Sequence, residues 1–253
     1  MEPPKKNVII LGHAGAGVDL VNSSYKPNTE KAIRAAVEVY QIDGVEVDVQ
    51  FSKDGVPVLF HDPYLENTLT ELSGRVHERM AGDMIGKPYR GYPHNSQEEL
   101  LSLEWLFDYV NNSSKKVVVN LDIKVYDPDF DYKNNAKLLD SLIFKYNLMD
   151  QMIIESKSRK MLLEMKKVDP AYLCLFHTEY EASMIKPLFD DGLNGAVVRF
   201  NEVNQEIINE ITKHDLLLTT YGQIIQSDFN HIGSKNSDIV QVDNPVLALR
   251  WKD

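Results

Sequence analysis

The sequence predicts an α/β protein of the (β/α)8, TIM-type barrel class. The chain has 253 residues, a length typical of one barrel, and 43% of them are hydrophobic. Short apolar runs alternate with segments of helical spacing along nearly the whole chain. The later runs are almost wholly apolar, as expected for strands covered on both faces. We therefore expect residues 1–253 to form a single barrel domain.

The first elements are expected in the order strand, helix and hairpin. Residues 7–14 form a short β-rich run. Residues 28–40 place apolar side chains at the spacing of one helix face, with Thr29 as the N-cap. Residues 44–62 have the pattern of a β-hairpin, and Gly55 in its Lys-Asp-Gly turn can adopt a positive φ.

A polar excursion over residues 63–97 follows, and then one helix–strand pattern repeats. Helices are expected at 100–110, 131–147, 159–168, 179–191 and 204–215, and strands at 115–125, 151–156, 171–177, 194–200, 216–222 and 237–244. Pro187 is expected to kink or break its helix. An open doubly wound sheet is the alternative, but the glycines at 12, 15 and 17 lack the G-x-G-x-x-G spacing.

Composition argues against some partners. The formal net charge of −11 repels polyanions, so neither nucleic acid nor an anionic membrane is expected as a primary partner. The single cysteine, Cys174, lies in an apolar run and is expected to be a buried structural thiol. The first apolar run is too short for a signal peptide or a membrane helix. The compartment and the oligomeric state stay open.

The first arm of the hairpin carries two acids. Glu46 and Asp48 are two positions apart, so in a strand they share one face while valines 45, 47 and 49 share the other. Two carboxylates this close raise each other's pKa or need a cation between them. Hard oxygen ligands suit Mg²⁺ or Ca²⁺. A solvent-facing acidic strand is the alternative.

Other polar groups are expected near this pair. Pairing across the turn with residue numbers that sum to 107–109 brings His61 opposite Glu46 or within two positions of it. His13 lies at the end of the first strand, and Asp122 and Lys124 share one face near the end of the strand 115–125. The carboxyl ends of the strands hold the active site of a (β/α)8 barrel, so these groups converge on one rim.

Five segments carry a resemblance to a known family. They are GHAG, KPNTEKAI, VEVDVQFSKDGVPVLFHD, NLDIK and QVDNP, in that order, between residues 8 and 245. The chain resembles the glycerophosphodiester phosphodiesterase family, whose pattern has His-Arg-Gly, Pro-Glu-Asn-Thr, Glu-x-Asp-Val, Lys-Asp-Gly, His-Asp, Glu-x-Lys and Thr-Asp-x-Pro. The segment 44–62 matches that pattern almost residue for residue.

The resemblance implies a metal-dependent enzyme on a (β/α)8 barrel. Its substrate would be a small glycerophosphodiester, cleaved to glycerol 3-phosphate and an alcohol with one divalent cation, Mg²⁺ or Ca²⁺. It implies that Glu46, Asp48 and Asp122 are the metal ligands. It implies further that Lys124 contacts the phosphate and that His13 and His61 are the acid/base pair. Which histidine is the acid stays open.

The chain departs from the family pattern at two points. Ala14 stands where the family has arginine, and the glutamate before Asn-Thr is missing, with Lys26 or Pro27 in its place. Arg199, near the end of the strand 194–200, and Lys26 are candidates to replace the guanidinium. Asp122 also stands where the family has glutamate.

Tyr221 stands near the position of a family aromatic beside the substrate, so it is a further substrate-binding candidate. His177 ends the strand 171–177 and is weighed between a site role and a structural one. Asp243 is expected to hold the last loop.

Two alternative functions stay open. One is a barrel phospholipase of D-like or C-like specificity acting on lipid headgroups. The excursion over 63–97 is only weakly suited to docking, and the net charge opposes it, so no stable membrane association is expected. The other is a non-catalytic phosphodiester-binding protein, which the missing arginine would permit.

Overall fold

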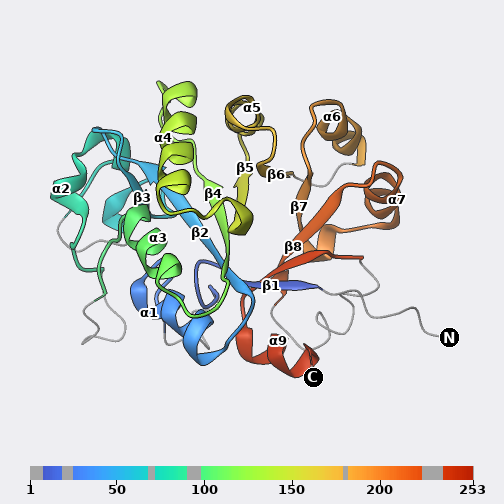
Figure 1. Ribbon diagram of the computed structural model, residues 1–253, viewed down its shortest axis with the longest axis horizontal. Coiled ribbons are helices and arrows are strands. Elements are labelled where there is room, and N and C mark those ends of the chain that lie inside the picture. Colours follow the sequence, from blue (N-terminus) through green and yellow to red (C-terminus); the bar gives the residue numbers. More distant parts are fainter. Residues whose placement is uncertain are drawn as a thin grey trace.

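Parallel strands close into a ring in the computed structural model, which describes residues 8–18, 25–67, 72–89, 98–178, 182–223 and 236–252 (Figure 1). The strands of the ring are β1 (Ile9–Gly12), β2 (Gly44–Phe51), β4 (Val118–Ile123), β5 (Met152–Ser156), β6 (Leu173–His177), β7 (Gly195–Arg199), β8 (Leu217–Gln223) and β9 (Ile239–Val242). Each pairs with its neighbours in parallel, and β1 pairs with both β9 and β2. The predicted eight-stranded (β/α)8 barrel is therefore confirmed.

The helices cover the outside of this ring. They are α1 (Glu30–Arg34), α2 (Ala81–Met84), α3 (Leu103–Asn111), α4 (Tyr132–Lys145), α5 (Arg159–Val168), α6 (Ile185–Asp190), α7 (Gln205–Lys213) and α9 (Pro245–Lys252). Shorter turns are η1 (Ala35–Val39), which is π-helical, and the 3₁₀ turns η2 (Leu65–Asn67), η3 (Val76–Glu78), η4 (Met149–Gln151), η5 (Ala182–Met184) and η6 (Phe200–Glu202). Figure 1 shows α4, α5, α6 and α7 following one another around the strands in chain order.

Two apolar layers result from the alternation of side chains along each strand. Outward residues such as Val45, Val47 and Val49 pack with the helices in the main core. A second cluster, formed by Leu11, Ile153, Leu175, Val197 and Ile239, belongs to the other face of the strands and fills the ring. Further along the strands, towards their carboxyl ends, this inner face turns polar, and the candidate site lies there.

The hairpin has the predicted register. β3 (Pro57–Leu59) pairs antiparallel with β2, with Val49 opposite Leu59 and Phe51 opposite Pro57, so paired residue numbers sum to 108. Gly55 has a φ of 78°, as its turn requires.

The described part of the excursion, residues 63–67 and 72–89, packs on the outer arm of the hairpin. Leu65, Val76, Met84 and Tyr89 form an apolar cluster with Val58 and Phe60. The excursion therefore supports the segment that ends at His61. The remainder of the predicted excursion, residues 68–71 and 90–97, lies outside the described residues.

Helix starts follow their capping residues. Thr29 accepts from the backbone N–H of Ala32, as predicted for the helix that comprises α1 and η1. The helix predicted at 100–110 begins only at Leu103, because Ser102 is its N-cap and the residues before it pair with the hairpin. The predicted helix 179–191 is described from Ala182 as η5 followed by α6, with Pro187 in the first turn of α6, where a proline is tolerated.

Candidate active site

Three buried carboxylates form the centre of the polar end of the barrel. Glu46 and Asp48 lie on β2, and Asp122 lies on β4 directly beside Asp48 in the strand register. The three residues are 1%, 2% and 4% exposed, and one oxygen of each lies within 4.8 Å of the others. We call Glu46, Asp48 and Asp122 the acid triad. The alternative of a solvent-facing acidic strand is wrong for Glu46 and Asp48, because both residues are buried inside the ring.

Neighbouring groups hold the triad in place. The backbone N–H of Ala14 donates to Glu46 Oε2 at 2.8 Å. The amide of Asn28 donates to Asp48 Oδ2 at 2.7 Å, and its carbonyl oxygen accepts from the Asp48 backbone N–H at 3.0 Å. Asp122 Oδ1, in contrast, is buried and has no hydrogen-bond partner in the described structure.

Lys124 is the cation closest to the triad. Its Nζ lies 2.9 Å from Asp48 Oδ1 and 2.5 Å from Asp122 Oδ2. Burial favours the neutral carboxyl of Asp48, but the Lys124 ammonium, the charge of His61 and the hydrogen bond from Asn28 together outweigh it and lower the pKa of Asp48 to about 2. Burial dominates at the other two acids, so the pKa of Asp122 rises to about 6 and that of Glu46 rises well above its usual range.

His13 lies beside the triad, and Asp243 orients its ring from the other side. Its Nδ1 is 2.6 Å from Asp243 Oδ1, and its Nε2 is 3.9 Å from Glu46 Oε2. Burial alone would lower the pKa of His13, but the hydrogen bond with Asp243 and the charges of Glu46 and Asp48 raise it to about 9. Asp243 was expected to hold the last loop, and the structure adds this contact with His13.

His61 lies at the other side, at the end of the hairpin. Its side chain is 58% exposed, and its Nδ1 is 3.0 Å from Asp62 Oδ1. The segment is fixed because Gln50 Nε2 donates to the carbonyl oxygens of Phe60 and Asp62. His61 is close enough to Asp48 for its charge to help lower the pKa of that carboxyl, after the larger effect of Lys124.

The remaining candidates differ in position. Tyr221, on β8, packs its ring against both His13 and His177, with ring centroids 6.1 and 5.0 Å apart. Arg199 is exposed at the end of β7, and it forms no ion pair with a carboxylate in the described ranges. Lys26 Nζ lies 5.8 Å from the centroid of the Tyr89 ring. Burial lowers the pKa of Lys26, and the charges of Glu98 and Asp62 partly offset that effect. The structure thus places Tyr221 beside His13 and His177, whereas Arg199 is exposed at the carboxyl end of β7.

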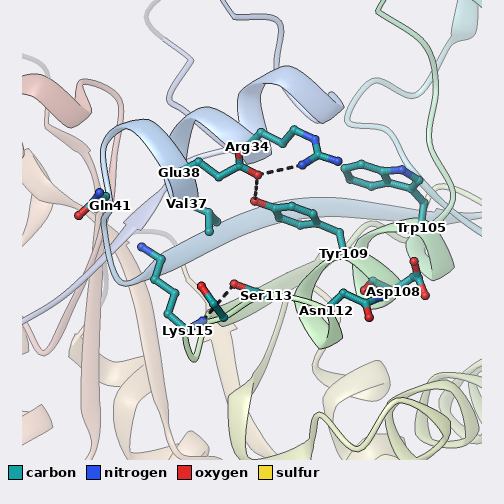
Figure 2. Close-up of a pocket in the computed structure, with 11 residues that line it drawn as sticks. Arg34, Val37, Glu38, Gln41, Trp105, Asp108, Tyr109, Asn112, Ser113 and Lys115 are labelled. Atoms are coloured by element: carbon teal, nitrogen blue, oxygen red, sulfur yellow. Dashed lines mark hydrogen bonds and ion pairs between the residues drawn. The ribbon is translucent and has the colours of Figure 1, made fainter.

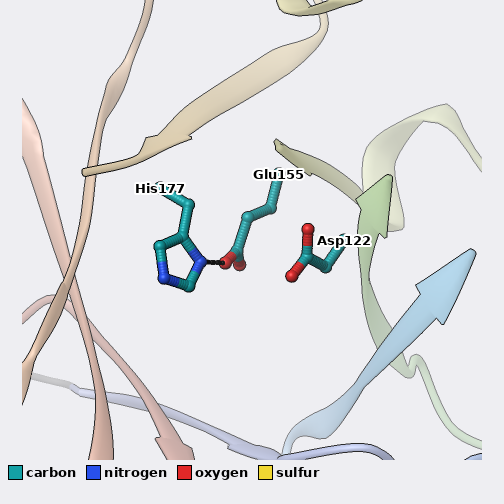
Figure 3. A group of neighbouring side chains, drawn as sticks. All are labelled: Asp122, Glu155 and His177. Carbon is teal, nitrogen blue, oxygen red and sulfur yellow. Dashed lines mark hydrogen bonds and ion pairs between the residues drawn. The ribbon is translucent and has the colours of Figure 1, made fainter. Parts of the chain in front are cut away.

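Sequence reasoning missed a second polar group in the barrel. Glu155, on β5, is 1% exposed and lies beside Asp122 in the strand register. It receives hydrogen bonds from Asn120 and Gln241, and its Oε1 is 2.9 Å from His177 Nδ1 (Figure 3). The signal was present in the sequence, since an acid near the carboxyl end of a strand is the pattern that singled out Asp122. His177, which was weighed between two roles, therefore does face the interior.

A separate surface groove lies away from these residues. It has a volume of about 730 Å³ and is lined by α1, η1 and α3, including Arg34, Glu38, Trp105 and Tyr109 (Figure 2). Its other lining residues, such as Gln41 and Lys115, precede β2 and β4, so the groove faces the amino ends of the strands. It contains no member of the acid triad.

The comparisons with known proteins are consistent across sequence and structure. The family model described as "Glycerophosphoryl diester phosphodiesterase family" matches residues 21–246. The Arabidopsis thaliana chloroplastic glycerophosphodiester phosphodiesterase GDPD1 is 25% identical over 265 residues, covering 85% of this chain and 72% of its own length. A Bacillus subtilis glycerophosphodiester phosphodiesterase is 24% identical over 242 residues, covering 89% of this chain and 80% of its own.

Solved structures share the fold. A putative glycerophosphodiester phosphodiesterase from Galdieria sulphuraria superposes with a TM-score of 0.84 at 18% identity, covering 98% of this chain and 99% of that one. An Oleispira antarctica phosphodiesterase, solved with the product sn-glycerol-3-phosphate, gives 0.83 at 17% identity over 97% and 96% of the two chains. No helix within the described ranges is long and apolar enough to cross a bilayer.

Proposed function

The chain belongs to the glycerophosphoryl diester phosphodiesterase family, and from that premise we propose that it hydrolyses small glycerophosphodiesters to glycerol 3-phosphate and an alcohol. The reaction would require one divalent cation, Mg²⁺ or Ca²⁺, held by the acid triad. The observation that carries the proposal is a buried acid triad with His13 3.9 Å from one of its members. The complex of the Oleispira phosphodiesterase supports glycerol 3-phosphate as the product.

The residues fit a hard cation. Carboxylate oxygens are the ligands that Mg²⁺ and Ca²⁺ prefer, and the triad offers three within 4.8 Å of one another. The buried Asp122 Oδ1 without a partner also fits, because such an oxygen is costly unless something binds it. Glu46, Asp48 and Asp122 would hold the ion, which when bound would offset the charge of the phosphodiester and of its transition state.

The chain's own groups supply the remaining chemistry. Lys124 puts a positive charge at the edge of the triad, where it would contact a phosphate oxygen. His13 hydrogen-bonds Asp243 through Nδ1, so Nε2 is the atom that would hold or transfer a proton. His61 lies at the opposite side with its ring exposed, so a substrate or water can reach it. One ring would take the proton of the nucleophile and the other would protonate the leaving alkoxide.

The direct test is turnover of soluble diesters. The chain is first treated with a chelator and then supplied with Mg²⁺ or Ca²⁺, and release of glycerol 3-phosphate from glycerophosphocholine and glycerophosphoethanolamine is measured. We expect turnover with the cation and none without it. The same assay on liposomes separates this function from a phospholipase, and absence of turnover on any diester with the cation present would refute the proposal.

Substitution of the two histidines distinguishes an enzyme from a binding protein. His13→Ala and His61→Ala should each lower kcat by about 10²-fold or more, because general acid–base catalysis typically contributes that much. His77→Ala, in η3, is the matched control and should leave kcat unchanged. A pure binding protein would show no turnover, either in the unmodified chain or in the variants.

A further inference from the structure

We propose that Asp122, Glu155 and His177 bind a second divalent cation, of a softer kind than Mg²⁺ or Ca²⁺. These residues lie at or next to the carboxyl ends of three successive strands of the ring, β4, β5 and β6, and face its interior (Figure 3). Their donor atoms lie within 4.8 Å of one another. The inference rests on the proposed function only in that the first cation would share Asp122.

The distance between two of the donors already suits a metal ion. His177 Nδ1 and Glu155 Oε1 are 2.9 Å apart. Two ligand atoms at adjacent corners of an octahedral ion, each about 2.1 Å from it, are about 3.0 Å apart. An ion could therefore replace the hydrogen-bonded proton with little movement of either side chain, and the ring would then carry its proton on Nε2.

The third donor, which the first cation would share, has an oxygen available to a ligand. Asp122 is 4% exposed, and its Oδ1 has no hydrogen-bond partner among the residues described. Figure 3 shows its carboxylate turned towards that of Glu155. A buried carboxylate oxygen without a partner destabilises the folded chain, and coordination to an ion would remove that penalty.

A layer of hydrogen bonds fixes the donors in the way typical of metal sites. Asn120 and Gln241 donate to Glu155 Oε2 at 2.7 and 2.6 Å, which leaves Oε1 facing His177. The other nitrogen of His177, Nε2, lies 3.3 Å from the hydroxyl of Tyr221. Ligating histidines usually donate from their second nitrogen to such a partner, which sets the tautomer and the ring orientation.

The donor set determines the kind of ion. An imidazole with two carboxylates suits Mn²⁺ or Zn²⁺, whereas the all-oxygen acid triad suits Mg²⁺ or Ca²⁺. A carboxylate shared between two ions, as Asp122 would be, is compatible with two-metal phosphoryl-transfer sites, where the ions lie about 3.5–4 Å apart. The second ion would add a further positive charge next to the phosphodiester.

The test counts bound ions and does not depend on turnover. The chain is stripped with a chelator and equilibrated with Mn²⁺, and the bound metal is measured by equilibrium dialysis with elemental analysis. We expect two Mn²⁺ per chain, of which excess Ca²⁺ displaces only one. His177→Phe keeps a ring but removes the nitrogens, and should leave one ion that Ca²⁺ displaces. Glu46→Gln should preferentially weaken the Mn²⁺ ion that Ca²⁺ displaces, and the control His77→Phe should still bind two ions.

Other outcomes contradict the inference. A single Mn²⁺ that His177→Phe leaves unchanged would overturn the second site while leaving the proposed function to its own turnover test. A single ion weakened equally by His177→Phe and Glu46→Gln would mean one shared ion and would also overturn it. If His177→Phe does not fold, judged by near-ultraviolet circular dichroism, Gln241→Met replaces it and should weaken the second ion about 10-fold.

Discussion

Asn28 illustrates how a single side chain can position a candidate ligand. Its backbone has a φ of 60°, a conformation that asparagine tolerates better than most residues, and its amide makes two hydrogen bonds to Asp48. Asn28→Gly keeps the backbone conformation accessible and removes only the amide. We expect cation affinity to fall about 10-fold to 100-fold, the usual effect of losing a group that orients a ligand.

Calorimetric titration with Mg²⁺ or Ca²⁺ measures this effect. Asn147→Gly is a matched control, because Asn147 also has a positive φ of 52° but lies exposed at the end of α4. It should bind the cation like the unmodified chain. Equal affinities in all three proteins would show that Asn28 does not position Asp48.

Asp243 presents the same question for His13. The pair at 2.6 Å orients the ring and favours its protonated form. Asp243→Asn keeps the size of the side chain but removes its charge, so we expect kcat to fall by roughly 10-fold to 100-fold with little change in KM. Steady-state kinetics measures both constants. Asp83→Asn, on the exposed side of α2, is the control, and a rise in KM alone would mean that Asp243 acts on substrate binding instead.

At this scale the sequence predicted the local part of the site better than the distant part. Glu46, Asp48 and His61 lie within one hairpin, so strand alternation and turn register were enough to bring them together. Asp243 and His13 are 230 positions apart, and their contact exists only because β9 and β1 are neighbours at the closure of the ring. Arg199, chosen for its guanidinium and its place near the end of a strand, lies exposed at the end of β7.

Among the elements, the neighbouring strands β2 and β4 approach each other closely at a glycine. A Cβ built on Gly44, the first residue of β2, would lie 1.9 Å from the carbonyl oxygen of Val118 on β4. Since that oxygen belongs to the backbone, the strands would have to separate. We expect Gly44→Ala to lower the free energy of unfolding by about 1–3 kcal/mol or more, the usual range for overpacking a rigid interior.

Urea unfolding followed by circular dichroism measures that loss. Gly82→Ala is the matched control, because a Cβ on Gly82 meets no atom within 4 Å and the residue lies in the helix α2. The control should be neutral or slightly stabilising, since alanine is the better helix former. If both variants unfold at the same urea concentration as the parent chain, the tight contact between β2 and β4 is not a constraint.

The limits of element prediction also have a physical cause. The helix α5 was predicted with its full bounds, because Ser158 caps it and its apolar spacing is regular. The start of α3 was placed three residues early, because Leu101 and Ser102 pair with the hairpin and local periodicity does not report such pairing. The last segment, α9, begins with Pro245, and the sequence was not assigned a helix there.

At the scale of the whole molecule, the polar interior of the barrel couples folding to pH. In chain stripped of metal, the pKa of His13 rises from 6.5 to about 9 despite its burial, through Asp243 and the nearby acids. Between these values the folded chain holds a proton that the unfolded chain releases. The stabilisation is therefore complete below pH 6.5 and is lost as the pH rises to 9, by roughly 3 kcal/mol.

The contribution of His13 can be isolated with His13→Gln, which does not titrate. The free energy of unfolding is measured in urea at several pH values from 6 to 9.5, in chelator, for both proteins. The other buried groups, including the acid triad and Lys124, remain present in both, so their own pH dependence largely cancels in the difference. The unmodified chain should lose stability relative to His13→Gln as the pH rises from 6.5 to 9. A constant difference from pH 6 to 9.5 would show that folding leaves the proton affinity of His13 unchanged, and that the contact with Asp243 does not hold the ring in its charged form.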